Sequence, residues 1–211
     1  MLDEQESKPR RRYRGESSAE RQEARRVRLV AAGLAVFGGG TGYGAATVRQ
    51  VCAEAGLTER YFYESFANRN DLFLAVYAHC VERVGAALIP AIEVAEDTAE
   101  ARARALLEAY FGELERDPRF ARVLLIEVLS LGPELEHVYR DAMSLFTELL
   151  RANASLLLPR VSLAEGRDEI AAAGLVGAIV HVAMRWVISN FERPREEVVR
   201  GLLDLLVAAS R

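Results

Sequence analysis

Residues 47–66, TVRQVCAEAGLTERYFYESF, limit the folds open to this chain more than any other stretch. Thr47 followed by Gln50 has the spacing of a capping box, in which two side chains satisfy the first amide groups of a helix. Gly56 is suited to end that helix because glycine adopts a left-handed conformation without steric cost. Thr58 can start a second helix. We therefore predict two short helices joined by a glycine turn, a helix-turn-helix, whose second helix typically enters the DNA major groove.

Helical periodicity continues through most of the remaining chain, and no segment has the alternation of a strand. We expect an all-α fold with further helices at 20–37, 68–88, 97–117, 118–129, 134–157, 168–190 and 195–209. Pro90 is expected to end the long helix that starts after Asn68, because proline interrupts a helix. Asp117 and Pro118 form a start signal, a capping residue followed by a first-turn proline.

The glycine-rich segment 38–44 invites a comparison with phosphate-binding loops. It follows a helix rather than a strand, lacks a Gly-Lys-Ser/Thr ending and does not match G-x-G-x-x-G. We therefore expect a flexible connector that packs Tyr43 back onto the small N-terminal domain.

Charge is distributed unevenly along the chain, although the net charge is only −4. Between Lys8 and Arg28 there are nine basic residues and three acidic ones, a local balance of +6, so the remainder carries −10. A basic end on an acidic body suits a protein that holds a polyanion at one end only. Residues 1–18 lack apolar periodicity, so a solvated tail without a DNA contact is the alternative for them.

We expect no targeting signal and no metal-binding pattern. The N-terminal charges have no hydrophobic segment behind them, and no apolar run is expected to be long enough to span a membrane. Cys52 and Cys80 lie within helical patterns and have no ligand spacing with the three histidines. These features indicate a reduced, cytoplasmic protein with buried thiols, no metal site and no cofactor.

The last two expected helices are unusually apolar. The first is rich in small residues from Ala171 to Ala183, and the second carries valines and leucines from Val198 to Val207 that occupy more than one stripe. A helix that is apolar on most sides must be covered on most sides. We therefore expect a symmetric homodimer in which this pair packs against its copy as a four-helix bundle. A buried hairpin within a monomer is the alternative.

Residues 25–77 resemble the N-terminal domain of the TetR family of bacterial transcription regulators. The resemblance rests on GY at 42–43, TV at 47–48, VCA at 51–53, AGLT at 55–58 and YFYESFANRNDL at 61–72. It implies an N-terminal three-helix helix-turn-helix domain and a helical ligand-binding and dimerisation domain. In this chain the expected segments are a basic flexible arm at 1–18, the helix-turn-helix domain at 19–67 and the helical domain at 68–211.

The resemblance also implies DNA-binding roles for residues within the motif. Side chains at a helix N-terminus, tyrosine hydroxyls and cations can hold DNA phosphates. The candidate phosphate contacts are Thr47, Tyr63 and Arg69. Arginine can pair with guanine through two hydrogen bonds, and glutamate can accept one from cytosine or simply complement the helix dipole. The candidate base contacts are Arg49, Glu59, Arg60 and Tyr61.

Polar residues set among apolar ones in the C-terminal helices allow an apolar pocket with a few orienting groups. The candidate ligand-binding residues are Tyr110, Glu127, Tyr139, His181, Arg185 and Trp186. Each is alternatively a paired core or interface residue. Glu127 is the most suggestive, because a buried carboxylate needs a partner, here either Arg185 or a cationic ligand.

The expected function is that of a ligand-responsive regulator, by the family's usual habit a repressor, that binds a palindromic operator as a homodimer. A small molecule that prefers another spacing between the domains would release it from DNA, because coupling between sites is reciprocal. A helical dimeric adaptor that does not read DNA is the alternative. An enzyme is disfavoured, since the sequence has no nucleophile-base spacing, metal cluster or cofactor loop.

Overall fold

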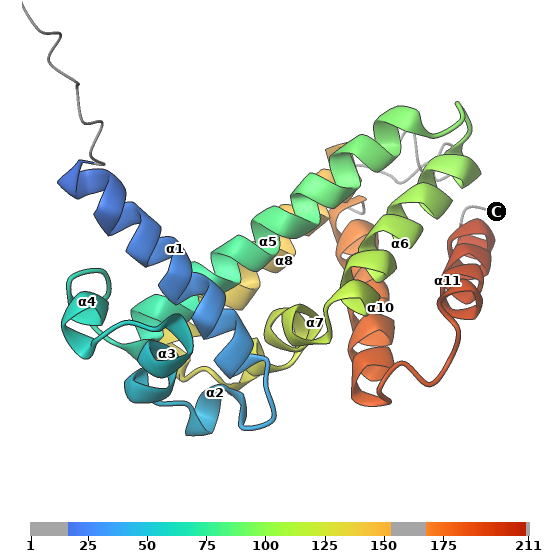
Figure 1. Ribbon diagram of the computed structural model, residues 1–211. Helices are drawn as coiled ribbons and strands as arrows, with labels where there is room; N and C mark the ends of the chain where they lie inside the picture. Colours follow the sequence, from blue (N-terminus) through green and yellow to red (C-terminus); the bar gives the residue numbers. More distant parts are fainter. Residues whose placement is uncertain (1–16, 153–167, 210–211) are drawn as a thin grey trace, which may run out of the picture.

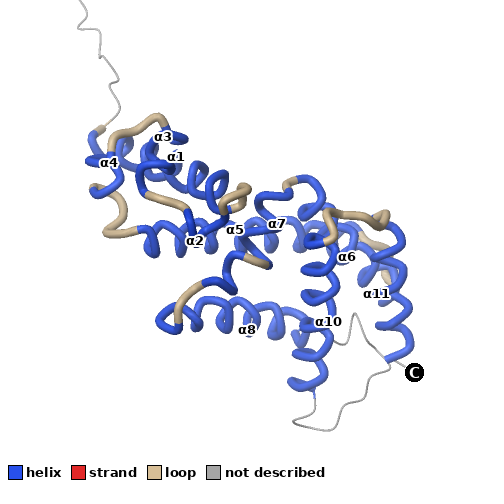
Figure 2. Tube along the Cα trace, turned by 90° about the horizontal axis from the view of Figure 1, so that it is seen from below, coloured by secondary structure: helices blue, strands red, loops and turns tan. Residues whose placement is uncertain are grey.

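The computed structural model describes residues 17–152 and 168–209, and within these ranges every regular element is helical, which confirms the all-α class. The N-terminal elements are α1 (Ser18–Phe37), α2 (Gly42–Ala45), α3 (Val48–Ala55) and α4 (Glu59–Tyr63). They are followed by α5 (Arg69–Val94), α6 (Ala99–Arg116), α7 (Pro118–Leu125), η1 (Glu127–Ser130), η2 (Pro133–Leu135), α8 (Glu136–Ala152), α10 (Asp168–Ile188) and α11 (Arg195–Ala209). Figures 1 and 2 show α1 to α4 gathered at one end of the molecule. Most of the expected basic arm and the last residues of the helix expected at 134–157 lie outside the described residues.

The predicted helix-turn-helix is confirmed in its local geometry. Thr47 Oγ1 accepts a hydrogen bond from the Gln50 amide at 3.2 Å, and Gln50 Oε1 accepts one from the Thr47 amide at 2.8 Å. Gly56 ends α3 in the left-handed region, with φ of 61°. Thr58 occupies the capping position of α4, but its side chain makes no capping hydrogen bond.

Helix α5 connects the two ends of the molecule (Figure 1). Its predicted start is confirmed: the Asn68 side chain caps the helix by accepting from the Asp71 amide. Its expected end was wrong: the helix continues through Pro90 to Val94. Proline removes one backbone hydrogen bond, and this loss is tolerated because α5 packs along α6.

Other helix limits differ from expectation for local reasons. Helix α6 begins at Ala99, two residues later than expected, because the Thr98 side chain caps it by accepting from the Ala101 amide at 3.1 Å. The helix expected at 118–129 divides at Ile126, where α7 ends and the short 3-10 turn η1 begins. Asp117 caps α7 as predicted, accepting from the amides of residues 119 and 120 at 3.2 Å.

The last two helices do not pack mainly on each other. Helix α10 packs chiefly against α8, while α11 packs chiefly against α6. By length and composition alone, α5 and residues 169–188 of α10 are apolar enough to cross a membrane, contrary to the expectation from sequence. Core helices of water-soluble proteins meet the same criterion. Helix α5 supplies six buried side chains to the core, which accounts for its apolar composition.

Candidate nucleic-acid interface and ligand cavity

The helix-turn-helix presents one face to solvent and buries the other. Phe62 of α4 is fully buried, together with Val51 of α3. The motif residues predicted to contact DNA from α3 and α4 are all exposed: Thr47, Arg49, Glu59, Arg60, Tyr61 and Tyr63. Six of the seven candidates therefore lie outside the core and are accessible to solvent.

Two of the base-reading candidates on α4, Arg60 and Tyr61, contact charged neighbours from the end of α4 and from α1. Arg60 Nε lies 3.2 Å from Glu64 Oε1, and Arg25 lies 3.5 Å from the other oxygen of the same carboxylate. The Arg25 guanidinium also stacks on the Tyr61 ring, 4.6 Å from its centroid. These contacts orient Arg60 while leaving 84% of its side chain exposed.

Arg69, the seventh candidate, differs from the other six because it has a structural role. Its Nη1 donates to the Ala46 carbonyl oxygen at 2.6 Å and to that of Gly44 at 3.3 Å. Its guanidinium also lies 4.4 Å from the centroid of the Tyr43 ring. Arg69 therefore ties the start of α5 to the segment between α2 and α3.

Sequence reasoning counted the arginines of α1 only as part of a basic N-terminal segment and missed their contacts with the motif. Arg28 Nη2 donates to the Ala55 carbonyl oxygen at 2.6 Å, and Arg26 Nη1 donates to that of Ser65 at 3.2 Å. Both acceptors lie at or just beyond the C-terminal ends of motif helices, where a cation is favoured. These arginines anchor the helix-turn-helix on α1.

Glu127 connects the N-terminal domain to the rest of the chain. Its side chain is 4% exposed. Its Oε2 accepts a hydrogen bond from the Tyr43 amide at 2.7 Å, and its Oε1 accepts one from Arg122 Nε at 2.9 Å. We call these two bonds the Glu127 bridge. The partner of the buried carboxylate is thus neither Arg185 nor a ligand, the two alternatives considered from sequence.

Two glycines allow this close contact between the domains. A Cβ on Gly38 would overlap the backbone carbonyl of Arg119, at the start of α7. Gly42 has φ of +67°, and a Cβ there would lie 2.8 Å from Glu127 Oε2. The connector is therefore packed against α7 and η1 rather than being the loose segment expected from sequence.

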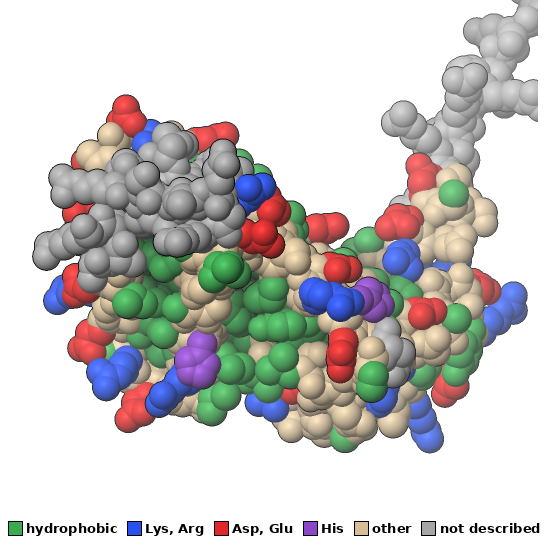
Figure 3. All heavy atoms as spheres, turned by 180° about the vertical axis from the view of Figure 1, so that it is seen from behind, with side chains coloured by type: hydrophobic (Ala, Val, Ile, Leu, Met, Phe, Trp, Pro, Cys, Tyr) green, Lys and Arg blue, Asp and Glu red, His purple; other side chains and the backbone are tan. Residues whose placement is uncertain are grey.

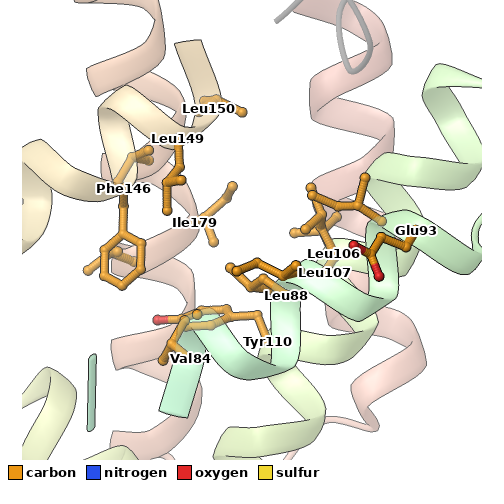
Figure 4. Close-up of a pocket in the computed structure, with 15 residues that line it drawn as sticks. Val84, Leu88, Glu93, Leu106, Leu107, Tyr110, Phe146, Leu149, Leu150 and Ile179 are labelled. Atoms are coloured by element: carbon orange, nitrogen blue, oxygen red, sulfur yellow. The ribbon is translucent and has the colours of Figure 1, made fainter. Parts of the chain in front are cut away.

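A cavity of about 370 Å³ lies between four helices of the C-terminal part (Figure 4), within the usual size range of ligand pockets. Its lining residues are Val84, Gly85, Leu88, Ile89, Ile92 and Glu93 of α5, Leu106, Leu107 and Tyr110 of α6, Phe146, Leu149 and Leu150 of α8, and Val176, Ile179 and Val180 of α10. Among these described residues Glu93 is the one acid and none is basic.

The structure brings one of the six predicted ligand-binding residues, Tyr110, into this cavity. The other five are not among the described lining residues: Glu127, Tyr139, His181, Arg185 and Trp186. Trp186 is buried and donates from its indole nitrogen to the Arg193 carbonyl oxygen at 2.8 Å. The aliphatic side chains that form most of the cavity were read from sequence as ordinary core. The described residues contain no cluster of three or more potential metal-ligating side chains.

An exposed recognition helix on a small helical domain, coupled to a second domain with an apolar cavity, defines a helix-turn-helix DNA-binding regulator. A family model described as bacterial regulatory proteins, tetR family, matches residues 29–76. The transcriptional activator FasR of Mycolicibacterium smegmatis is 27% identical over 185 residues, 87% of this chain and 81% of that protein. Residues 29–76 are therefore a DNA-binding domain of the TetR family of bacterial transcription regulators.

Solved structures share the fold. FadR of Bacillus subtilis in complex with stearoyl-CoA has a TM-score of 0.73 and 20% identity, covering 87% of this chain and 98% of that one. A putative transcriptional regulator of Pseudomonas aeruginosa PAO1 has a TM-score of 0.74 and 23% identity, covering 94% and 93%.

Proposed function

We propose that this chain is a cytoplasmic regulator that binds a palindromic operator as a homodimer and is released from it when an apolar ligand fills the cavity. The observation that carries the proposal is that Thr47, Arg49, Arg60 and Tyr63 of the helix-turn-helix are exposed while Phe62 is buried. Sequence reasoning favoured repression, whereas the relative FasR is named an activator. Whether a regulator represses or activates depends on the position of its operator relative to the promoter. The proposal is therefore limited to the release of the protein from DNA.

Selection of bound sequences from random DNA by the full-length protein tests the proposal. An inverted repeat is expected, because a dimer places two recognition helices about one helical turn apart. Recovery of no enriched sequence would favour the alternative, a dimeric adaptor that does not read DNA.

Arg60→Ala is expected to weaken binding to the selected operator about 5- to 100-fold and to relax sequence preference at one position of each half-site. The reason is that Arg60 is exposed and oriented by Glu64. Arg104→Ala is the matched control, since Arg104 makes a similar exposed pair on α6. Fluorescence anisotropy on operator variants provides the measurement, and equal losses on all variants would assign Arg60 to a phosphate instead.

The dimer interface is proposed on α10 and α11. Exposed apolar or small residues recur along α10 at helical spacing, including Ile170, Ala173, Gly177 and Ile188. Hydrophobic side chains also gather over a broad area on the face opposite to that in Figure 1 (Figure 3). Such a surface on a water-soluble protein favours a protein partner. Glycines at the contact would let two copies of α10 approach closely.

Gly177→Arg is expected to convert the dimer to a monomer and to weaken operator binding in parallel. Gly177 has open space around it in the single chain, so the substitution does not disturb the fold of one subunit. Gly40→Arg, in equally open space on the connector, is the control. Light scattering after gel filtration measures the mass, and an unchanged dimer would place the interface elsewhere.

The ligand is proposed to carry a long hydrocarbon chain. The cavity is lined almost wholly by aliphatic and aromatic side chains, and each buried methylene contributes about 0.8 kcal/mol to binding. FadR of Bacillus subtilis, which has the same fold, was solved with stearoyl-CoA. Stearoyl-CoA is therefore the first compound to titrate, with calorimetry for binding and anisotropy for operator release.

A further inference from the structure

The cavity is apolar along its length but has a polar inner end. Tyr110 lines it, and Figure 4 shows its hydroxyl beside Val84, pointing away from Glu93. Glu93 and Ile89 are exposed, so their end of the cavity opens to solvent. Tyr110 is itself buried, which makes its hydroxyl one of the few polar groups available to the part of a ligand that enters first.

Two more tyrosines lie on helices that line the cavity, each two helical turns before a lining residue, Val84 of α5 and Phe146 of α8. Tyr77 lies two helical turns before Val84 on α5, and its side chain is 2% exposed. Its hydroxyl is buried and has no hydrogen-bond partner among the described residues. A buried hydroxyl without a partner is costly and calls for an explanation. Tyr139 of α8 is half-buried and packs against the same core.

Tyr77 and Tyr110 both have a raised pKa, and neighbouring tyrosines contribute to the effect. Burial raises the pKa of Tyr77, and the nearby Tyr139 raises it further. Burial likewise raises the pKa of Tyr110, with Tyr77 and Tyr139 adding to the effect. Tyr77 and Tyr110 therefore remain neutral donors and acceptors at physiological pH. Because no described lining residue is basic, a carboxylate at this end would have no counter-ion in the cavity wall.

We propose that the ligand carries a neutral oxygen group, a hydroxyl or a carbonyl, on the end of its hydrocarbon chain that enters first, and that Tyr110 and Tyr77, which we call the tyrosine cluster, bind it. The inference rests on the proposed function, in that the cavity takes a hydrocarbon ligand. A hydroxyl both donates and accepts, so it can satisfy phenols that a methyl end would leave unpaired. The other end of the ligand lies near Glu93 and solvent.

A matched pair of probes tests this assignment: dodecanoate and ω-hydroxydodecanoate, titrated by calorimetry into the full-length protein. The carboxylate is common to both, so the difference reports the far end alone. In a purely apolar cavity ω-hydroxydodecanoate should bind more weakly than dodecanoate, because its hydroxyl would be buried without a partner. Hydrogen bonds to the tyrosine cluster should make it the tighter ligand of the two. We expect ω-hydroxydodecanoate to bind about five- to tenfold more tightly, the effect of one buried hydrogen bond.

Tyr110→Phe is expected to abolish this preference while leaving dodecanoate affinity unchanged. Tyr63→Phe, which removes a phenol hydroxyl from the distant recognition helix, is the control and should keep the preference. Tyr77→Phe should reduce the preference without lowering the melting temperature of the unliganded protein, because the hydroxyl it removes has no partner.

Each outcome separates the inference from the proposed function. If both probes bind wild type equally, or dodecanoate binds more tightly, the oxygen-group proposal is overturned and the hydrocarbon site stands. If the preference survives in Tyr110→Phe, the tyrosine cluster is not its cause and the proposal fails. If neither probe nor stearoyl-CoA binds, the proposed ligand site fails as well. If the preference appears but operator affinity does not change, the inference holds and ligand-induced release is wrong.

Discussion

Replacing Gly38 with alanine is expected to destabilise the protein by about 3 kcal/mol, at the upper end of the range for overpacking. The added methyl group would overlap the carbonyl of Arg119, a backbone atom that cannot rotate away. For a chain of this length the loss corresponds to a fall in melting temperature of roughly 6–12 °C. Circular dichroism during thermal unfolding provides the measurement.

Gly40→Ala is the matched control, because a Cβ at Gly40 meets nothing within 4 Å. It lies two residues away on the same connector and should leave the melting temperature unchanged or slightly raised. If the two variants melted together, the connector would not be held against α7, and the flexible segment expected from sequence would be the better description.

Glu127→Ala is expected to uncouple ligand binding from DNA binding. It breaks the Glu127 bridge and leaves the buried Tyr43 amide without an acceptor, at a cost of about 1–3 kcal/mol in stability. Helices α6 and α10, which line the cavity, both pack on α7, and α7 leads directly into η1. We therefore expect movement of these helices around a ligand to be transmitted to α2 through Glu127. We expect the ratio of operator affinities with and without ligand to fall towards one.

Two further variants give this experiment a graded design. Glu127→Gln retains an oxygen that accepts from Tyr43 but loses the ion pair with Arg122, so it should keep most of the stability and only part of the coupling. Glu136→Ala removes an exposed carboxylate from α8 and should behave as wild type. A full ligand response in Glu127→Ala would mean that coupling runs through other contacts, such as those between α1 and α7.

Local signals were predictable from sequence, and contacts between distant segments were not. Helix caps and turn glycines depend on a few neighbouring residues, so they can be recognised from the sequence alone. The examples here are the caps at Thr47, Asn68 and Asp117 and the left-handed Gly56. The Glu127 bridge joins residues 84 positions apart. No short pattern identifies such a pair before the chain is folded.

The ligand candidates show the same limit in another form. Polar residues were selected because they interrupt apolar patterns, and this criterion found Tyr110. It could not find a cavity, which exists where aliphatic side chains fail to fill the space between helices. Gly85 illustrates the point, since it lines the cavity through the absence of a side chain.

Helix α5 determines where this protein can be divided. Three side chains of α5 are fully buried: Leu72, Phe73 and Val76. The centroid of the Phe73 ring lies 5.6 Å from that of Phe37 and 4.6 Å from that of Tyr43. A fragment ending at residue 67 would lose these side chains and open the centre of its own core. A chimaera that joins this helix-turn-helix domain to the ligand-binding domain of another regulator should therefore place its junction inside α5, beyond Val76. At that junction the two helix segments should have the same helical phase.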